Sequence, residues 1–174
     1  MQIIDLTLPL SNDTTVYPGD PKVNIERIQT FEKDDWNMKR LQINGHDGTH
    51  VNAPIHGTAD GKNLDDYDLI DFMGPGVKYE TDEDLKAGLV IIFDAINITQ
   101  ELAEKAVKAK VKSVGLSDKF EFDVEVEKWL LEQGMISFER LANTEKLPKA
   151  FFFHGAPLKI KEGDGSPIRA YAIV

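Results

Sequence analysis

Hydrophobic and polar residues follow two different patterns along this chain. Near the N-terminus, residues 3–8 mix apolar and β-branched side chains as a strand does, and residues 23–30 and 38–44 alternate loosely in the same way. Between the first two segments, Pro18-Gly19-Asp20-Pro21 is a strong turn signal. We therefore expect a strand in each of these segments, the last of which leads into a stretch rich in histidine.

The centre of the chain predicts alternating strands and helices. Residues 89–93 form a short, continuous apolar run that is typical of a buried strand, and residues 113–116 predict another. Between them Asn97 or Thr99 can cap a helix over residues 100–110. A second helix is expected over residues 124–133, where the following glycine ends it. This order of elements implies a right-handed parallel crossover.

The C-terminal part returns to strands. Residues 135–138 and 151–153 are strand-like, and the segments 156–160 and 168–173 flank Gly163-Asp164-Gly165, which favours a hairpin. No linker, repeat or low-complexity tract interrupts the chain. We expect a single α/β domain over residues 1–174, with a mixed sheet and a sizeable core.

Composition narrows the classes of function. The net charge is −10 and no cluster of Lys and Arg appears, so we expect no nucleic-acid partner. The absence of cysteine excludes disulfides, Cys nucleophiles and thiolate metal sites, so any metal must bind through histidine and oxygen ligands. The N-terminus lacks the features of a signal peptide, and the longest apolar run, residues 88–93, is too short to span a bilayer. We therefore expect a cytoplasmic protein without membrane contact.

Three of the four histidines fall within residues 46–56. Imidazole is the commonest transition-metal ligand and transfers protons near neutral pH. Glycine and proline residues here argue against a helix. In an extended segment every second side chain points to the same side, and this side would carry His46, His50, Asn52 and His56. We interpret the stretch as a built site, although its spacing alone matches no short metal motif.

The histidine segment resembles the signature of the cyclase-type metal-dependent hydrolases, which include bacterial kynurenine formamidase and isatin hydrolase. That signature is His-x-Gly-Thr-His-x-Asp-x-Pro-x-His, and here it reads His46-x-Gly48-Thr49-His50-x-Asn52-x-Pro54-x-His56. The likeness extends to residues 4–10, 17–21, 156–160 and 163–170, so it covers nearly the whole chain. It implies a swivelling β/β/α-type fold, a homodimer, and a divalent metal site that cleaves a formyl amide or a cyclic amide of a small-molecule substrate.

The resemblance also assigns roles to individual residues. His46 and His50 correspond to metal ligands, and His56 corresponds to the residue that transfers protons. Glu139, within the stretch 136–141, corresponds to a glutamate that the family carries there, and we expect it to take part in metal binding and catalysis.

Two positions depart from the family's pattern. Asn52 stands where the family has Asp, and Glu127 stands where it has His. An amide offers one carbonyl oxygen and no charge, so a bridging carboxylate is lost, whereas Glu127 partly restores the negative charge and can bind a hard cation. We expect one metal ion rather than two, with zinc first and manganese or iron as alternatives. The expected ligands are His46, His50, Asn52, Glu127 and Glu139.

Other side chains and the loop length add expectations. Asp47 is a candidate to orient a histidine, and a solvated loop position is equally compatible. His154 is expected in the core or the pocket wall, and Trp36 is expected to line the pocket or to pack. The loop after Phe93 is shorter than in the family, which predicts a more open pocket or one completed by a dimer partner.

The sequence leaves three functions open. The preferred one is a metal-dependent amidohydrolase in which His56 takes a proton from the activated water and returns it to the leaving nitrogen. The same site could instead dehydrate or cyclise a small oxygenated substrate. A member that binds a small molecule or a metal without turnover is the third reading, which Asn52 and Glu127 favour, whereas the retained histidines favour an enzyme.

Overall fold

The computed structural model describes residues 1–174. Its main sheet consists of β1 (Ile3–Asp5), β4 (His50–Asn52), β5 (Met73–Lys78), β6 (Val90–Phe93), β7 (Ser113–Ser117), β8 (Ile136–Leu141), β9 (Ala150–His154), β10 (Gly165–Pro167) and β11 (Tyr171–Ile173). The two longer helices are α2 (Gln100–Lys108) and α3 (Val124–Glu132). Short 3-10 turns cover Pro54–His56, Leu64–Asp66, Leu69–Phe72, Asp82–Asp84 and Thr144–Lys146.

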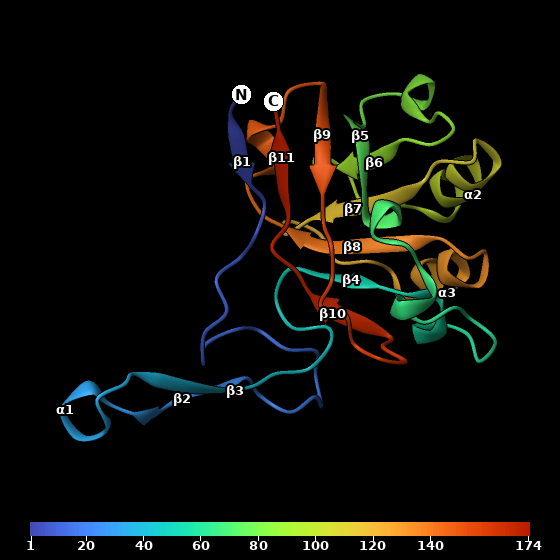
Figure 1. Ribbon diagram of the computed structural model, residues 1–174. Helices are drawn as coiled ribbons and strands as arrows, with labels where there is room; N and C mark the ends of the chain where they lie inside the picture. Colours follow the sequence, from blue (N-terminus) through green and yellow to red (C-terminus); the bar gives the residue numbers. More distant parts are fainter.

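The main sheet is mixed and curled (Figure 1). Its nine strands follow the order β1-β11-β9-β5-β6-β7-β8-β4-β10. The neighbours from β5 to β8 are parallel, and the remaining pairs are antiparallel. In Figure 1, β1, β11 and β9 stand upright while β7, β8 and β4 lie across them, so the sheet bends like half of a barrel. The predicted α/β class with a mixed sheet is confirmed.

The parallel strands carry the core on both faces of the sheet. β6 is buried at every position. Val90 and Ile92 belong to a cluster of 17 buried residues, whereas Ile91 and Phe93 belong to one of 13. Because successive side chains of a strand point to opposite faces, the two clusters lie on opposite faces. The second cluster includes residues of α2 and α3, so these helices cover one face only.

Both helices begin beside a capping side chain. Thr99 accepts a hydrogen bond from the backbone N–H of Leu102, and Asp123 accepts one from that of Glu125. Gly134, with a φ of 78°, follows the end of α3 as the sequence predicted. None of the helices is both long enough and apolar enough to cross a lipid bilayer.

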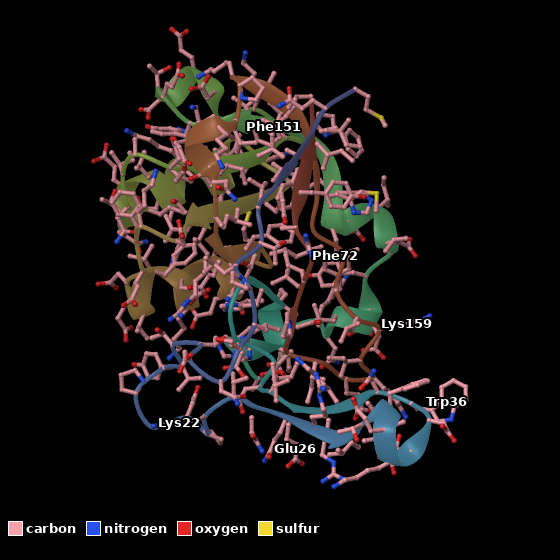
Figure 2. The ribbon with its side chains drawn as sticks, turned by 90° about the vertical axis from the view of Figure 1, so that its left-hand side faces the viewer. Lys22, Glu26, Trp36, Phe72, Phe151 and Lys159 are labelled. Atoms are coloured by element: carbon pink, nitrogen blue, oxygen red, sulfur yellow. The ribbon has the colours of Figure 1, made fainter.

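A separate arm consists of β2 (Asn24–Gln29) and β3 (Met38–Gln42), which form a two-stranded sheet, and the one-turn helix α1 (Phe31–Asp34). Figure 1 shows the arm projecting from the body, and Figure 2 places Trp36 at its far end, away from Phe72 and Phe151. The strands expected over 23–30 and 38–44 are thus confirmed, but outside the main sheet. Trp36 is 72% exposed, so within this chain it does not pack against the core.

Two expectations about strands differ from the structure, and one strand was not expected. The predicted hairpin of residues 156–160 and 168–173 is wrong, because β10 pairs with β4 while β11 lies between β9 and β1. A single bridge, between Pro157 and Ile168, joins the two predicted segments. The strand expected over residues 3–8 ends at Asp5. The pattern does not predict β5, because a Gly-Pro-Gly sequence interrupts its apolar residues.

Candidate active site

The pairing of β4 sets the geometry of the histidine segment. β4 lies between β8 and β10, and its register sets His50 opposite Glu139 and Asn52 opposite both Ser137 and Gly165. Alternate residues of a strand share a face, so His50, Asn52 and Glu139 point to one side. The extended conformation predicted for this segment is confirmed at residues 50–52, whereas residues 45–49 form a turn and a bend and residues 54–56 form a 3-10 helix.

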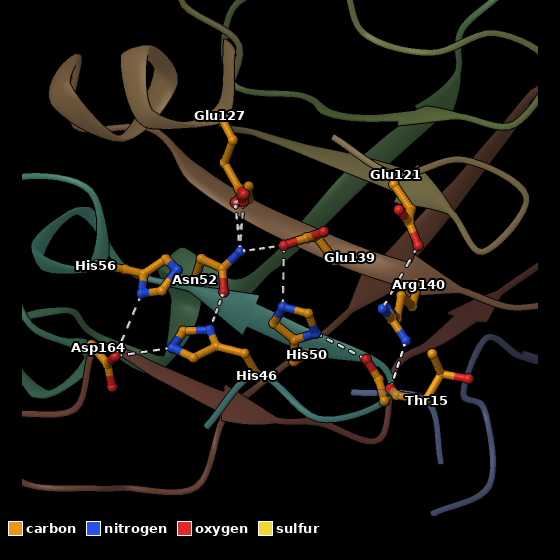
Figure 3. Close-up of polar contacts among 12 residues, drawn as sticks. Thr15, His46, His50, Asn52, His56, Glu121, Glu127, Glu139, Arg140 and Asp164 are labelled. Carbon is orange, nitrogen blue, oxygen red and sulfur yellow. Dashed lines mark hydrogen bonds and ion pairs between the residues drawn. The ribbon is translucent and has the colours of Figure 1, made fainter. Parts of the chain in front are cut away.

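An outer group of three side chains comprises His46, His56 and Asp164 (Figure 3). Nε2 of His46 lies 2.9 Å and Nδ1 of His56 lies 3.5 Å from Oδ2 of Asp164. The two imidazole rings stack at a centroid distance of 3.9 Å. Because the potential ligand atoms of the three residues lie within 4.8 Å of one another, this group could hold a metal ion.

An inner group comprises His50, Asn52, Glu127 and Glu139. The amide of Asn52, which is fully buried, contacts both carboxylates of this group. Its Nδ2 donates to Oε1 of Glu127 at 2.6 Å and to Oε1 of Glu139 at 2.7 Å, with a longer contact of 3.3 Å to Oγ of Ser137. Its Oδ1 faces Nδ1 of His46 at 2.7 Å. Asn52 therefore links the outer histidine to both carboxylates. The inner and outer groups together contain every side chain that the sequence analysis assigned to the site.

His50 faces a carboxylate with one of its two nitrogens. Its Nδ1 lies 2.9 Å from the backbone carbonyl oxygen of Gly48, which can only accept, so Nδ1 carries the hydrogen. In the neutral ring Nε2 then holds a lone pair, and it lies 3.1 Å from Oε1 of Glu139. Two electron-rich atoms at this distance require a proton or a cation between them.

The pKa values of the two carboxyl groups of the inner group, Glu127 and Glu139, are shifted in opposite directions. Burial and the neighbouring charge of Glu139 raise the pKa of Glu127 above its usual value. Burial alone would raise the pKa of Glu139 as well, but hydrogen bonds and charge interactions, led by those with His50, lower it. One carboxylate thus favours its protonated form while its neighbour remains ionised.

The pKa values of two residues of the outer group, His56 and Asp164, are also shifted. Burial and the nearby charge of His46 lower the pKa of His56, against the opposing effect of Asp164. Burial alone would raise the pKa of Asp164, but its hydrogen bond with His46 lowers it. Asp164 therefore presents a charged oxygen to both imidazoles, which is the arrangement that orients histidines at metal and proton-transfer sites.

Glycines allow the segments to approach closely. A Cβ on Gly165 would lie 2.7 Å from Nδ1 and 3.0 Å from Nε2 of His46, so only glycine leaves room for this ring. Gly48 has a φ of 65°, in the left-handed region, and a Cβ there would lie 2.9 Å from Cδ2 of Leu10. Both glycines thus have a steric role at the site.

The remaining side chains of the motif hold the backbone. Oγ1 of Thr49 donates to the carbonyl oxygen of Arg140 at 2.6 Å and accepts from the backbone N–H of Leu8 at 2.9 Å. Asp47 accepts from the backbone N–H of Asn44 at 2.6 Å, so it closes a turn and does not orient a histidine. It is also buried, which rules out the solvated loop position.

His154 lies in β9 and stacks on Tyr171 of β11 at a centroid distance of 4.8 Å, so its contact is with the neighbouring strand. Asp164 was not among the expected site residues, because Gly163-Asp164-Gly165 reads as a turn in the sequence. Its position within a segment that resembles the family was the one available signal.

The fold and the site together define a mixed α/β protein with a histidine–carboxylate centre. The Cyclase family model, described as "Putative cyclase", matches residues 4–138. The chain belongs to this family, as the resemblance implied. The kynurenine formamidase of Salinibacter ruber is 28% identical over 206 aligned positions, which cover 98% of this chain and 96% of that protein. The kynurenine formamidase of Bacillus cytotoxicus is 27% identical, with coverages of 96% and 95%.

Solved structures show the same fold. Isatin hydrolase A from Labrenzia aggregata superposes with a TM-score of 0.85 at 21% identity, covering 99% of this chain and 93% of that one. An isatin hydrolase bound to the product analogue thioisatinate gives a TM-score of 0.84 at 22% identity, with coverages of 99% and 92%. The alignment with the Salinibacter protein is longer than the 174 residues of this chain, so that relative carries insertions which this chain lacks.

Proposed function

We propose that this chain is a metal-dependent hydrolase that cleaves a formyl amide or a cyclic amide of a small molecule. Relatives named kynurenine formamidase along nearly the full length, and neighbours named isatin hydrolase, support the reaction class. The contact between Nε2 of His50 and the Glu139 carboxylate is the observation that carries the proposal, because it calls for a proton or a cation at that point and a divalent cation meets that need.

The pair His50 and Glu139 fits a divalent cation, whereas the group of three whose potential ligand atoms all lie within 4.8 Å of one another is His46, His56 and Asp164. Two ligands of a tetrahedral zinc ion, each about 2.0–2.1 Å from it, lie roughly 3.3 Å apart, which is close to the 3.1 Å between His50 and Glu139. We assign the cation to these two residues together with His46 and the carbonyl oxygen of Asn52. Zinc is our first choice, and manganese or iron would suit the same mixture of nitrogen and oxygen.

The outer group could hold an ion as well, but burial favours the inner position. The side chains of His50 and Glu139 are 4% and 17% exposed, whereas those of His56 and Asp164 are 39% and 56% exposed. Charge interactions are stronger where water is excluded. We therefore assign proton transfer, and not metal binding, to His56 and Asp164.

The reaction is hydrolysis of a C–N bond. When bound, the cation acidifies a water molecule and polarises the amide carbonyl. His56 faces Asp164 through Nδ1, which leaves Nε2 to accept a proton from the attacking water. His56 then returns the proton to the leaving nitrogen as the C–N bond breaks. The products are an amine and a carboxylic acid, joined in one molecule when the substrate is cyclic.

The test combines metal analysis with an assay. Protein purified without chelator is analysed for metal by plasma mass spectrometry, and hydrolysis of N-formylkynurenine and of isatin is then followed by absorbance. We expect bound metal, turnover of at least one substrate, and loss of both after chelation with recovery on adding zinc. A protein that binds metal but hydrolyses neither substrate would favour the dehydratase or cyclase reading, and one without metal or turnover would favour a binding protein.

Assembly and location are further proposals. We propose a homodimer in the cytoplasm. The projecting arm supports the dimer, because it exposes Phe31, Trp36 and Leu41, which are 62%, 72% and 55% exposed, respectively. Light scattering during gel filtration would show a mass near twice 19.5 kDa if the dimer is correct.

A further inference from the structure

The Asn52 amide has two chemically different ends, and the site uses both. Its oxygen faces His46 on the outer side, and its NH2 group faces the carboxylates of Glu127 and Glu139 on the inner side (Figure 3). The orientation follows from chemistry, because an ionised carboxylate can only accept hydrogen bonds. Reversing the amide would set its oxygen against the carboxylate of Glu139.

The NH2 group of Asn52 already fills the space between the carboxylates of Glu127 and Glu139. Each hydrogen of the Asn52 NH2 group has a carboxylate oxygen within a strong hydrogen-bond distance, at 2.6 and 2.7 Å from Nδ2. Oγ of Ser137 donates to the same oxygen of Glu127 at 2.9 Å. A cation bound to both carboxylates would need the space that the NH2 group occupies, and it would lie against two donors that repel it.

The amide also accounts for the close approach of two acidic side chains. Glu127 comes from α3 and Glu139 from β8, and both reach the same nitrogen of a residue in β4. A carboxylate at position 52 would place a third acidic group within about the same distances, with the hydroxyl of Ser137 as the one donor between Glu127 and position 52. Such a cluster needs a cation to be stable.

We propose that Asn52 limits the centre to one cation, because its NH2 group takes the place of a second one between Glu127 and Glu139. The inference rests on the proposed metal-dependent function for the first cation. Glu127 is then a hydrogen-bond partner of Asn52 and binds no metal in this chain. Replacing the NH2 group by an oxygen, in Asn52→Asp, opens a position for a second cation held by residues 52, 127 and 139.

The test counts zinc ions in matched variants. Metal-free wild type, Asn52→Asp and Asn63→Asp are titrated with Zn²⁺ and dialysed, and bound zinc is measured per chain. Asn63 is the control, because its Nδ2 also faces a carboxylate, that of Asp66 at 3.2 Å, but at the exposed surface. We expect Asn52→Asp to bind one zinc ion more than the wild type and the control to bind the same number as the wild type.

Thermal unfolding gives a second readout that does not depend on turnover. Without metal, the melting temperature of Asn52→Asp should fall by about 10 °C, since an unpaired buried charge costs roughly 3 kcal/mol and each kcal/mol shifts a chain of this size by about 2–4 °C. Added zinc should raise it more than it raises that of the wild type. If the variant does not fold without metal, it is purified with zinc present throughout, and bound zinc per chain is measured after dialysis against the same buffer for the variant, the control and the wild type.

The outcomes separate this inference from the proposed function. Two zinc ions on the wild type, or equal numbers on the wild type and Asn52→Asp, would overturn the inference and leave amide hydrolysis standing. A gain of one zinc ion in Asn52→Asp would support the inference even if neither amide is hydrolysed, and that failure would count against the proposed function alone.

Discussion

Replacing Gly165 by alanine should displace His46 without altering any side chain of the site. The new Cβ would lie 2.7 Å from Nδ1 and 3.0 Å from Nε2 of the ring, and closer still to Cε1. Ordinary contacts begin near 3.4 Å, so the ring or β10 must move by about 1 Å. The ring nitrogens of His46 lie 2.7 Å from Oδ1 of Asn52 and 2.9 Å from Oδ2 of Asp164, and neither contact survives a shift of that size in the same geometry.

The magnitude follows from these contacts. Two hydrogen bonds are worth about 1 kcal/mol each, and overpacking adds about 1–3 kcal/mol unless the surroundings yield. β10 is an edge strand and can yield, so we expect a loss of about 2 kcal/mol in the free energy of unfolding. Because a misplacement of about 1 Å can cost about 100-fold in rate, kcat/KM for amide hydrolysis should fall by about that factor.

The assay compares this variant with Gly163→Ala. Gly163 lies two residues before Gly165, and the atoms nearest to a Cβ there belong to Ile160, at 3.1–3.2 Å. Circular dichroism and urea unfolding would report the fold, and competition with a chromogenic chelator would report zinc affinity. Wild-type kcat/KM and zinc affinity in folded Gly165→Ala would refute the assignment of His46 to the metal site.

Variants at three further positions test separate parts of the site and the fold. His56→Asn should lower kcat by about 10²–10⁴-fold with unchanged zinc content, because proton transfer is lost while the ligands stay; equal loss of zinc would mean that His56 is a ligand. Asp164→Asn should lower kcat/KM by about 10–100-fold and Asp164→Glu by less, and a wild-type rate would deny it an orienting role. Burial alone would raise the pKa of Asp84, but Lys149 and backbone N–H groups lower it below the usual range. The unfolded carboxyl therefore binds its proton at a higher pH, so the wild type should lose stability below about pH 4 more steeply than Asp84→Asn, as urea unfolding at about pH 5 and about pH 3 would measure.

Local patterns were sufficient to predict the parallel centre of the fold. The run at residues 89–93, the cap at Thr99 and the glycine after α3 each depend on neighbours within a few positions, so the chain signals them directly. The pairing of β10 with β4 has no such signal. It depends on the steric fit between Gly165 and the ring of His46, which lie far apart in the sequence.

Some residues of the candidate site could likewise be predicted from local sequence, and others could not. The three clustered histidines could be identified from spacing, but the extended conformation expected for all of them is correct only at His50, since His46 lies in a turn and His56 in a 3-10 helix. Glu127 and Glu139 could be proposed only through the resemblance, because they lie 75 and 87 residues from Asn52, the residue that they contact. Asp164 lies 118 residues from His46, within a sequence that also fits an ordinary turn. Long-range pairing, which spacing does not encode, brings these residues together.

The two departures from the family's signature are best understood as one exchange. With a neutral imidazole, Asp and His carry one negative charge between them, and Asn52 with Glu127 also carry one when Glu127 is ionised. The carboxyl group thereby moves from β4 to α3, where burial and the charge of Glu139 raise its pKa, so the site carries this negative charge only when Glu127 loses its proton. The direct hydrogen bond of 2.6 Å between Asn52 and Glu127 shows why the two positions depend on each other. Either change alone would leave the site with an unpaired amide donor or with an additional carboxylate, and both are costly when buried.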